Sequence, residues 1–290
     1  MLFYHRYDMK VDGGSKHHST QSQQSQQSQQ QAQQQLGSAT EDSQAFGVAL
    51  DRLVDKDGAT VARMAPKAVL ESISYIRRTG LDTEGLFRRS PPSTALRAAK
   101  ERYNLGETVD LEQAGGVHVA AVLLKLFFRE LPQAVFGGGY SVVRGLPQAT
   151  EAGQSEDRQA VAEQMASVRV RYVREEIVGS LSKEYRRLLC CTFALLRAVA
   201  QREETNKMTA YNLAVVWAPN LARSEDPVED VAMCAAGPGA ATVGAVVQIM
   251  VQSFGAVFEA EVSEIAGAAG DADDADDAAR RVLDAIDQAN

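Results

Sequence analysis

Apolar residues recur at helical spacing along most of the chain, from about residue 45 to residue 262. Val69, Ile73 and Ile76, for example, fall three or four positions apart, which places them on one face of a helix. Glycine and proline residues separate such segments, and no segment alternates apolar and polar residues like a half-buried strand. The pattern predicts an all-α fold, a single helical domain of about eight or nine helices.

Local signals set the expected helix boundaries. Ser182 and Thr209 precede apolar helical segments and are predicted N-caps, whereas Gly80 and Pro219 are predicted to end helices. Residues 225–241 contain a Gly-Pro-Gly sequence and are predicted to form a loop. The predicted helices cover residues 66–79, 93–104, 118–131, 156–178, 183–203, 210–218 and 242–260.

The amino-terminal residues differ in composition from this central region. Residues 14–44 are dominated by Gln and Ser and have almost no apolar surface to bury. Burial of apolar surface is what offsets the entropy lost when a chain becomes ordered. Residues 1–44 are therefore predicted to be a disordered tail, and the folded domain is assigned to residues 45–262.

The carboxy-terminal residues 263–290 are rich in Ala and Asp and predict an acidic tail. They hold eight acidic residues against Arg280 and Arg281, a net charge of −6 out of −8 for the whole chain. The remaining residues carry only −2, so the folded region has no basic excess for binding nucleic acid. Three apolar residues in this tail predict a short helix that docks weakly or not at all, Val282, Leu283 and Ile286.

Several other classes of protein are not indicated. The first residues never reach the apolar stretch of a secretory signal. The most apolar helix, residues 242–258, carries Gln248 and Gln252 on one face, so it is predicted to be an amphipathic core helix and not a transmembrane span. The three cysteines, of which Cys190 and Cys191 are adjacent, predict buried thiols in a reducing compartment. No catalytic triad, zinc-ligand spacing or phosphate-binding glycine loop is present in the sequence.

Two basic residues interrupt another strongly apolar predicted helix. Lys125 and Arg129 stand four positions apart in residues 118–131, so they share one face. A buried cation is unfavourable unless it is paired or reaches solvent at a cleft. The pair therefore either forms salt bridges to internal acids or lines a binding groove.

Two asparagines bracket the predicted short helix that follows Thr209. Asparagine is a poor choice inside a helix unless its amide has a task. For Asn220, which follows Pro219, capping or turn stabilisation is a sufficient explanation. For Asn212, which lies inside the helix, both a structural and a functional role stay open.

The sequence TEGLFRRSPPS places Arg88 and Arg89 side by side between an apolar anchor and a helix start. An arginine in a loop is commonly a surface residue. Leu86 and Phe87, however, are expected to bury themselves and pin the loop, which would hold the adjacent guanidinium in place. A rigidly held guanidinium suits planar recognition of phosphate oxygens.

Four segments of the chain together resemble the successive motifs of the Rho-family GTPase-activating domain, RhoGAP. They occur in the family's order and span about residues 46–260: FGVALDRL, TEGLFRRS, LLKLFFRELP and NKMTAYNLAVVWAPNL. The chain is most similar to the RhoGAP domains that follow Sec14-type modules, although no such module is visible in it. The resemblance implies a helical domain that docks on a Rho- or Rac-type small GTPase.

The resemblance also implies a role for each candidate residue. Arg88 matches the family's arginine finger, which enters the GTPase site and neutralises charge on the transferring phosphoryl group. Lys125 and Arg129 match the basic pair that shapes the GTPase-facing groove, and Asn212 matches an asparagine near the finger. The remaining candidates are supporting residues, with Glu84 an internal partner for one of the cations: Arg89, Glu84, Pro219 and Asn220.

On this reading the chain hydrolyses nothing by itself and binds no cofactor of its own, since it acts on GTP and Mg²⁺ held by the partner. It is expected to be monomeric and cytoplasmic, recruited to membranes or cytoskeleton through its partner. The alternative is a catalytically inactive GAP-fold binding module or scaffold. Pro91 and Pro92 depart from the small residues usual after the finger, and the acidic tail raises the hypothesis of an autoinhibitor folded onto the basic groove.

Overall fold

The computed structural model describes residues 44–56, 64–136, 140–148, 158–237, 239–267 and 274–289. Within these ranges the chain is helical, and the β pairing recorded there is one parallel bridge between Phe136 and Ala222. This confirms the all-α prediction, although the described ranges hold more helices than the eight or nine expected, because short helices form in segments predicted to be loops. The predicted disordered tail lies outside the described residues except for Gln44. The same part of the chain contains no helix both long and apolar enough to span a membrane.

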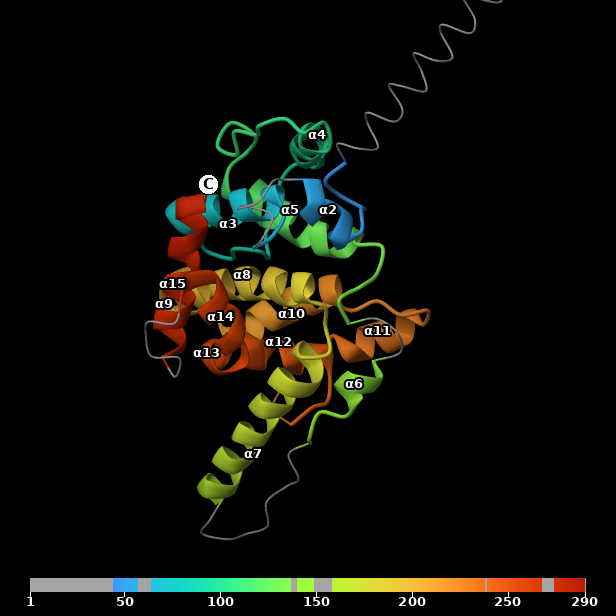
Figure 1. Cartoon of the computed structure of the whole chain (residues 1–290), viewed down its shortest axis with the longest axis vertical. Helices are drawn as coiled ribbons and strands as arrows, with labels where there is room; N and C mark the ends of the chain where they lie inside the picture. Colours follow the sequence, from blue (N-terminus) through green and yellow to red (C-terminus); the bar gives the residue numbers. More distant parts are fainter. Residues whose placement is uncertain are drawn as a thin grey trace, which may run out of the picture. The chain divides into compact units, whose positions relative to one another are not determined.

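Helices from the first half of the chain form one layer, at the top of Figure 1. Helix α3 packs along α5, and its stripe of Val69, Ile73 and Ile76 is fully buried as expected. At Gly80 a β-carbon would lie 2.9 Å from the Val117 methyl groups, so glycine permits the close approach of α3 and α5. The layer consists of α2 (Leu50–Lys56), α3 (Lys67–Thr79), α4 (Ser93–Asn104) and α5 (Val117–Glu130).

Helix α8 (Lys183–Ala200) runs through the middle of the described residues, where most of its side chains are buried (Figure 1). It packs against helices from both halves of the chain, which include α3, α10, α12 and α15. The remaining helices are α6 (Ser141–Arg144), α7 (Arg158–Tyr172), the π-helix η2 (Val173–Val178), α9 (Glu203–Asn206), α10 (Ala210–Leu221), α11 (Pro227–Met233), α12 (Val243–Gln252), α13 (Phe254–Val257), α14 (Glu259–Ala266) and α15 (Ala275–Ala289).

The predicted caps are partly confirmed. The hydroxyl oxygen of Thr209 accepts a hydrogen bond from the backbone N–H of Asn212 at 3.1 Å and caps α10. Ser182 does precede α8, but its hydroxyl donates to the Glu184 carboxylate at 2.7 Å and caps no backbone N–H.

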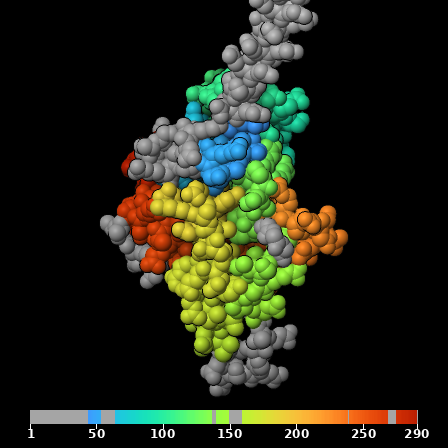
Figure 2. Space-filling view, turned by 45° about the vertical axis from the view of Figure 1, so that its right-hand side comes forward, coloured from blue at the N-terminus to red at the C-terminus, as the bar shows by residue number. Residues whose placement is uncertain are grey.

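Three predicted boundaries are wrong. Pro219 does not end α10, because it lies inside a helix that continues to Leu221. The predicted loop at 225–241 contains α11, which projects at the right of Figure 2 in orange and is capped by the Asp226 carboxylate. The predicted helix 242–260 is interrupted at Ser253, where the backbone leaves helical geometry between α12 and α13.

The carboxy-terminal segment also departs from the prediction of an acidic tail. Residues 275–289 form α15, which packs along α8 and also against α3 (Figure 1). The Asp274 carboxylate caps this helix by accepting hydrogen bonds from the N–H groups of Asp276 and Asp277 at 2.9 and 3.2 Å. Its apolar face is buried, including the three residues expected to dock weakly, Val282, Leu283 and Ile286. Helix α15 therefore belongs to the core.

Buried aromatic rings join the amino-terminal segment to the loop that follows α3. Phe46 contacts Phe127 at 5.8 Å between ring centroids, and Phe127 contacts Phe128 at 6.1 Å. Phe128 in turn contacts Trp217 at 5.6 Å, and Trp217 contacts Phe87 at 5.3 Å. Edge-to-face pairs of this kind stabilise beyond the area that they bury. Through this row of rings, Phe87, the residue before Arg88, packs against α5 and α10.

Candidate functional site

The chain between α3 and α4 contains a tight turn at residues 85–89, which ends on the two arginines. The carbonyl of Gly85 accepts hydrogen bonds from the backbone N–H groups of Arg88 and Arg89 at 2.9 and 3.1 Å. Gly85 has a φ of +69°, which glycine adopts without strain. Pro91 and Pro92 follow this turn, and Pro92 directly precedes α4. The two prolines therefore leave the hydrogen bonds of the turn intact.

Phe87 holds the turn in the protein interior. Its φ is +68°, a conformation that is uncommon for a bulky residue and that persists only where surrounding contacts enforce it. Its side chain is fully buried against Trp217, so packing supplies that enforcement. Because Phe87 points inward, the next residue is directed to solvent.

Lys125 secures the same backbone from helix α5. Its Nζ donates a hydrogen bond to the Phe87 carbonyl at 2.6 Å. Burial, and secondarily the positive charge of Arg129 one helical turn away, lower the pKa of Lys125. Lys125 forms no salt bridge within the described residues and binds a loop carbonyl, while its place in a GTPase-facing groove stays a prediction.

Arg88 and Arg89 are both exposed, and neither guanidinium forms a hydrogen bond or ion pair with any residue in the described ranges. A β-carbon on Gly85 would lie 3.6 Å from Nη2 of Arg88, so this guanidinium rests over the turn. Arg89 approaches the same position with its aliphatic Cγ, also at 3.6 Å. The contacts that hold the loop come from Lys125 and Phe87, and the supporting role of Arg89 stays a prediction.

Arg129 and Asn212 extend the site along α5 and α10, two helices that pack together. The Arg129 side chain is exposed and unpaired within the described residues, while its carbonyl accepts from Arg223 at 2.9 Å. The Asn212 amide donates to the carbonyl of Lys207 at 2.9 Å, so it ties the start of α10 to the preceding turn. Asn212 therefore has a structural role, through its amide and through its N–H, which Thr209 caps, and its functional role stays a prediction.

The family profile described as the RhoGAP domain matches residues 66–226, more than half of the 290 residues. The chain belongs to the RhoGAP domain family. Arg88, Lys125, Arg129 and Asn212 all lie within the matched residues.

Curated relatives show the same similarity over part of their length. This RhoGAP domain is 32% identical over 185 residues to Rho GTPase-activating protein 1 of Mus musculus, which covers 63% of this chain and 38% of the relative. It is also 32% identical over 176 residues to Rho GTPase-activating protein gacZ of Dictyostelium discoideum, 61% of this chain and 16% of the relative. The chain thus spans well under half the length of these relatives.

Solved structures share the fold. The crystal structure of human Rho GTPase activating protein 15 aligns with a TM-score of 0.57 at 22% identity, over 74% of this chain and 92% of that chain. The BH domain of GRAF, the GTPase regulator associated with focal adhesion kinase, aligns with a TM-score of 0.50 at 18% identity. It covers 66% of this chain and 93% of that one.

Three predicted residues do not join the loop and its supports. Glu84 is exposed and forms no ion pair within the described residues, so the expected internal partnership with a cation is wrong. The Asn220 amide donates to the Val216 carbonyl at 2.9 Å in its own helix, eight positions and about 12 Å along α10 from Asn212. Pro219 is exposed on the same turn of that helix.

Two contributors were missed by reasoning from the sequence. Asn206 is fully buried, and its carbonyl accepts a hydrogen bond from the Gly85 N–H at 2.8 Å. Arg223 donates to the carbonyls of Arg129, Leu131 and Pro132 and thereby caps the carboxy-terminal end of α5. In the sequence, Asn206 stands three residues before the predicted N-cap Thr209, and this position alone does not show that its side chain is buried.

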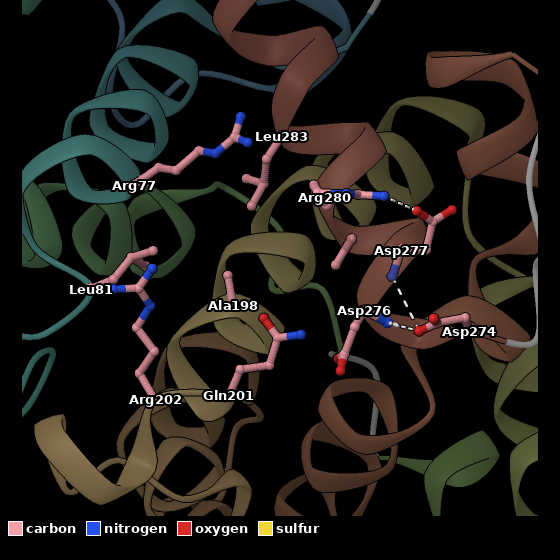
Figure 3. A pocket seen from close by; sticks show the side chains of 11 residues that line it. Arg77, Leu81, Ala198, Gln201, Arg202, Asp274, Asp276, Asp277, Arg280 and Leu283 are labelled. Atoms are coloured by element: carbon pink, nitrogen blue, oxygen red, sulfur yellow. Dashed lines mark hydrogen bonds and ion pairs between the residues drawn. The ribbon is translucent and has the colours of Figure 1, made fainter.

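The hollow shown in Figure 3 lies between α3, α8 and α15 and has a volume of about 460 Å³. Its charged side chains are paired within the fold, since Arg280 contacts Asp277 and Arg77 contacts Asp284. Asp276 pairs with Arg197, so none of these described acids of α15 pairs with Lys125 or Arg129. The described acids of residues 274–289 therefore give no support to an autoinhibitor on the basic groove, and that hypothesis for the whole tail, residues 263–290, stays a prediction.

Proposed function

We propose that this RhoGAP domain stimulates GTP hydrolysis by a Rho- or Rac-type small GTPase and that Arg88 is its arginine finger. The observation that carries the proposal is the contrast within the loop. The backbone at Phe87 is anchored by ring packing and by the Lys125 hydrogen bond, yet the Arg88 guanidinium is exposed and unpaired within the described residues.

The chemistry of phosphoryl transfer accounts for this arrangement. Negative charge develops on the phosphoryl oxygens in the transition state, and a guanidinium placed against them stabilises it without a proton transfer. The GTPase supplies the Mg²⁺ and the residue that orients water. Because the backbone that carries the finger is held before docking, only the arginine side chain has to become ordered when it enters the partner's site. Such an arginine is worth about 10³–10⁵ in rate.

The surface beside the loop supports docking of another protein. On α10, Tyr211 and Val215 are 49% and 46% exposed, four positions apart and therefore on one face. Helix α10 packs against α5, which carries the exposed Arg129. Aromatic and arginine side chains on an exposed face are typical of protein interfaces.

The test uses the full chain and a panel of Rho- and Rac-type GTPases loaded with GTP and Mg²⁺. Single-turnover hydrolysis is followed with the parent, with Arg88→Ala and with Arg89→Ala as a matched control. We expect Arg88→Ala to reduce stimulation by at least about 10³-fold, with binding to the GTP-loaded GTPase retained and Arg89→Ala close to the parent. Full stimulation by Arg88→Ala would overturn the finger assignment. Binding without stimulation by the parent would identify an inactive GAP-fold scaffold.

A further inference from the structure

We infer that Asn206, at the end of α9, is a positioning residue for the finger loop. This inference rests on the proposed function of Arg88. Asn206 is fully buried and opens the segment NKMTAYNLAVVWAPNL, but the resemblance assigned it no role. A buried amide is stable only when its donors and acceptor all find partners. The partners of Asn206 are the beginning of the finger loop, the end of α8 and the start of α10.

Asn206 binds the finger loop at two separate points. Its Nδ2 donates to the carbonyl of Leu81 at 2.8 Å, where the loop leaves α3. Its main-chain oxygen accepts from the Gly85 N–H at 2.8 Å, and the Gly85 carbonyl in turn receives the Arg88 N–H. One residue therefore holds both ends of the segment that leads to the finger.

The same side chain joins this loop to the two helices behind it. Nδ2 also donates to the Val199 carbonyl in the last turn of α8 at 2.8 Å. Oδ1 accepts from the Met208 N–H at 2.8 Å, which sets the backbone just before α10. Lys207 between them has a φ of +61°, and its carbonyl accepts from the Asn212 amide. Asn206 thus relates the position of Arg88 to that of Asn212.

The chemistry of this position selects an asparagine. Both Nδ2 hydrogens point at carbonyls, while Oδ1 meets an N–H, so the site requires two donors and one acceptor on a short side chain. Aspartate would keep the acceptor and turn an anionic oxygen toward two carbonyls. Alanine would remove the side-chain partner of all three backbone groups, and of these only the Val199 carbonyl would keep another recorded partner, the Arg202 N–H at 3.1 Å.

Asn206 acts on catalysis only through the loop, since it is buried and has no surface to offer a partner. Small displacements of a catalytic group cost about 10² in rate even when the change is remote from the chemistry. We therefore expect Asn206→Asp to lower the maximal stimulated rate by about 10²-fold and to leave the Kd for the GTP-loaded GTPase within about threefold.

Amide hydrogen exchange provides a readout independent of activity. In the parent, the N–H groups of Gly80 and Gly85 are both hydrogen-bonded, to Ile76 and to Asn206 respectively. Asn206→Asp is expected to reduce protection at Gly85 by about tenfold or more while Gly80 stays protected. Equal loss at both glycines would mean general destabilisation and would overturn the inference.

Two kinetic controls complete the test. Val262→Ala in α14 destabilises the fold away from the loop, because α14 pairs with the beginning of α8 and Asn206 contacts its end. At an equal fall in Tm, this variant should keep the stimulated rate that Asn206→Asp loses. In an Arg88→Ala background, Asn206→Asp should cause no further loss. Equal rate loss in Val262→Ala, or a full additional loss in the double variant, would overturn the role of Asn206. If Asn206→Asp does not melt cooperatively, Asn206→Ser replaces it under the same criteria.

These outcomes separate the inference from the function on which it rests. If Arg88→Ala stimulates as well as the parent, the proposed finger fails. If Arg88→Ala is inactive while Asn206→Asp retains the parental rate, the finger stands and the positioning role of Asn206 fails.

Discussion

The Nζ atom of Lys125 lies 2.6 Å from the main-chain oxygen of Phe87 and donates a hydrogen bond to it. Phe87 directly precedes Arg88, so helix α5 holds the backbone from which the proposed finger projects. A basic residue expected to face the partner thus also has a task within the domain. The contact makes the conformation of the loop depend on α5 before any partner binds.

Substitution of Lys125 tests this dependence. Lys125→Met keeps the apolar stem and removes the hydrogen bond to the Phe87 carbonyl, so the stimulated rate of GTP hydrolysis should fall by about tenfold to a hundredfold. The matched control is Lys100→Met, because Lys100 is also half-buried but pairs with Glu130 at 2.7 Å. Single-turnover assays should show the loss in the first variant alone, and equal rates in the two variants would contradict the prediction.

The pKa of Lys125 leads to a prediction about stability. Burial and Arg129 lower this pKa below its ordinary value of 10.5, so the native protein loses this proton at a lower pH than the unfolded chain does. Between the lowered value and 10.5 the unfolded chain binds more protons than the native protein, and stability therefore rises with pH. In urea unfolding at pH 8 and pH 10, the parent should gain free energy of unfolding relative to Lys125→Met. A gain on lowering the pH would refute the stated direction.

Helix α15 should contribute to global stability. Leu283 is buried against the rest of the domain, and its truncation to alanine should lower the free energy of unfolding by about 2–5 kcal/mol. Val228 on α11 is 77% exposed, so Val228→Ala should change it by less than about 0.5 kcal/mol. Thermal or urea denaturation measures both, and similar small effects would mean that α15 docks weakly.

The cysteines should react with thiol reagents in a defined order. Cys190 and Cys191 are fully buried, and burial raises the pKa of Cys191 to about 12 and that of Cys190 well above its ordinary range. Cys234 is only partly buried, although burial raises its pKa as well. Since the thiolate is the reactive form, native protein at pH 8 should be modified at Cys234 first, and at the other two after unfolding. Mass spectrometry of the modified sites decides, and simultaneous labelling of all three would contradict this order.

Much of the fold was predictable because helical periodicity is a local property. The stripe of Val69, Ile73 and Ile76 defines α3, and Thr209 marks the start of α10, since each signal acts over a single turn or two. The wrong helix boundaries arose where tertiary packing or solvent exposure overrode a local sequence rule. Pro219 removes one N–H donor, yet α10 continues because the carbonyl left without it belongs to Val215, which is 46% exposed and open to water.

The carboxy-terminal helix shows the same limit on a larger scale. Its composition is dominated by Ala and Asp, which indicates little about burial. Helix α15 is held in place because its narrow apolar face packs against α8, and because Arg77 and Arg197 form ion pairs with its aspartates. That complementarity joins positions about 80 to 200 residues apart, which no periodicity can report.

Periodicity and motif order are enough to predict a helical chain, to locate the RhoGAP motifs and to select Arg88, Lys125, Arg129 and Asn212 as candidate residues. How these residues are related follows from the fold: Lys125 and Asn206 hold the loop, Glu84 and Asn220 do not, and Arg88 is left exposed. The physical reason is that hydrogen bonds to backbone carbonyls depend on where distant segments meet. A side chain's identity states what it is able to donate, and the fold determines which atom receives it.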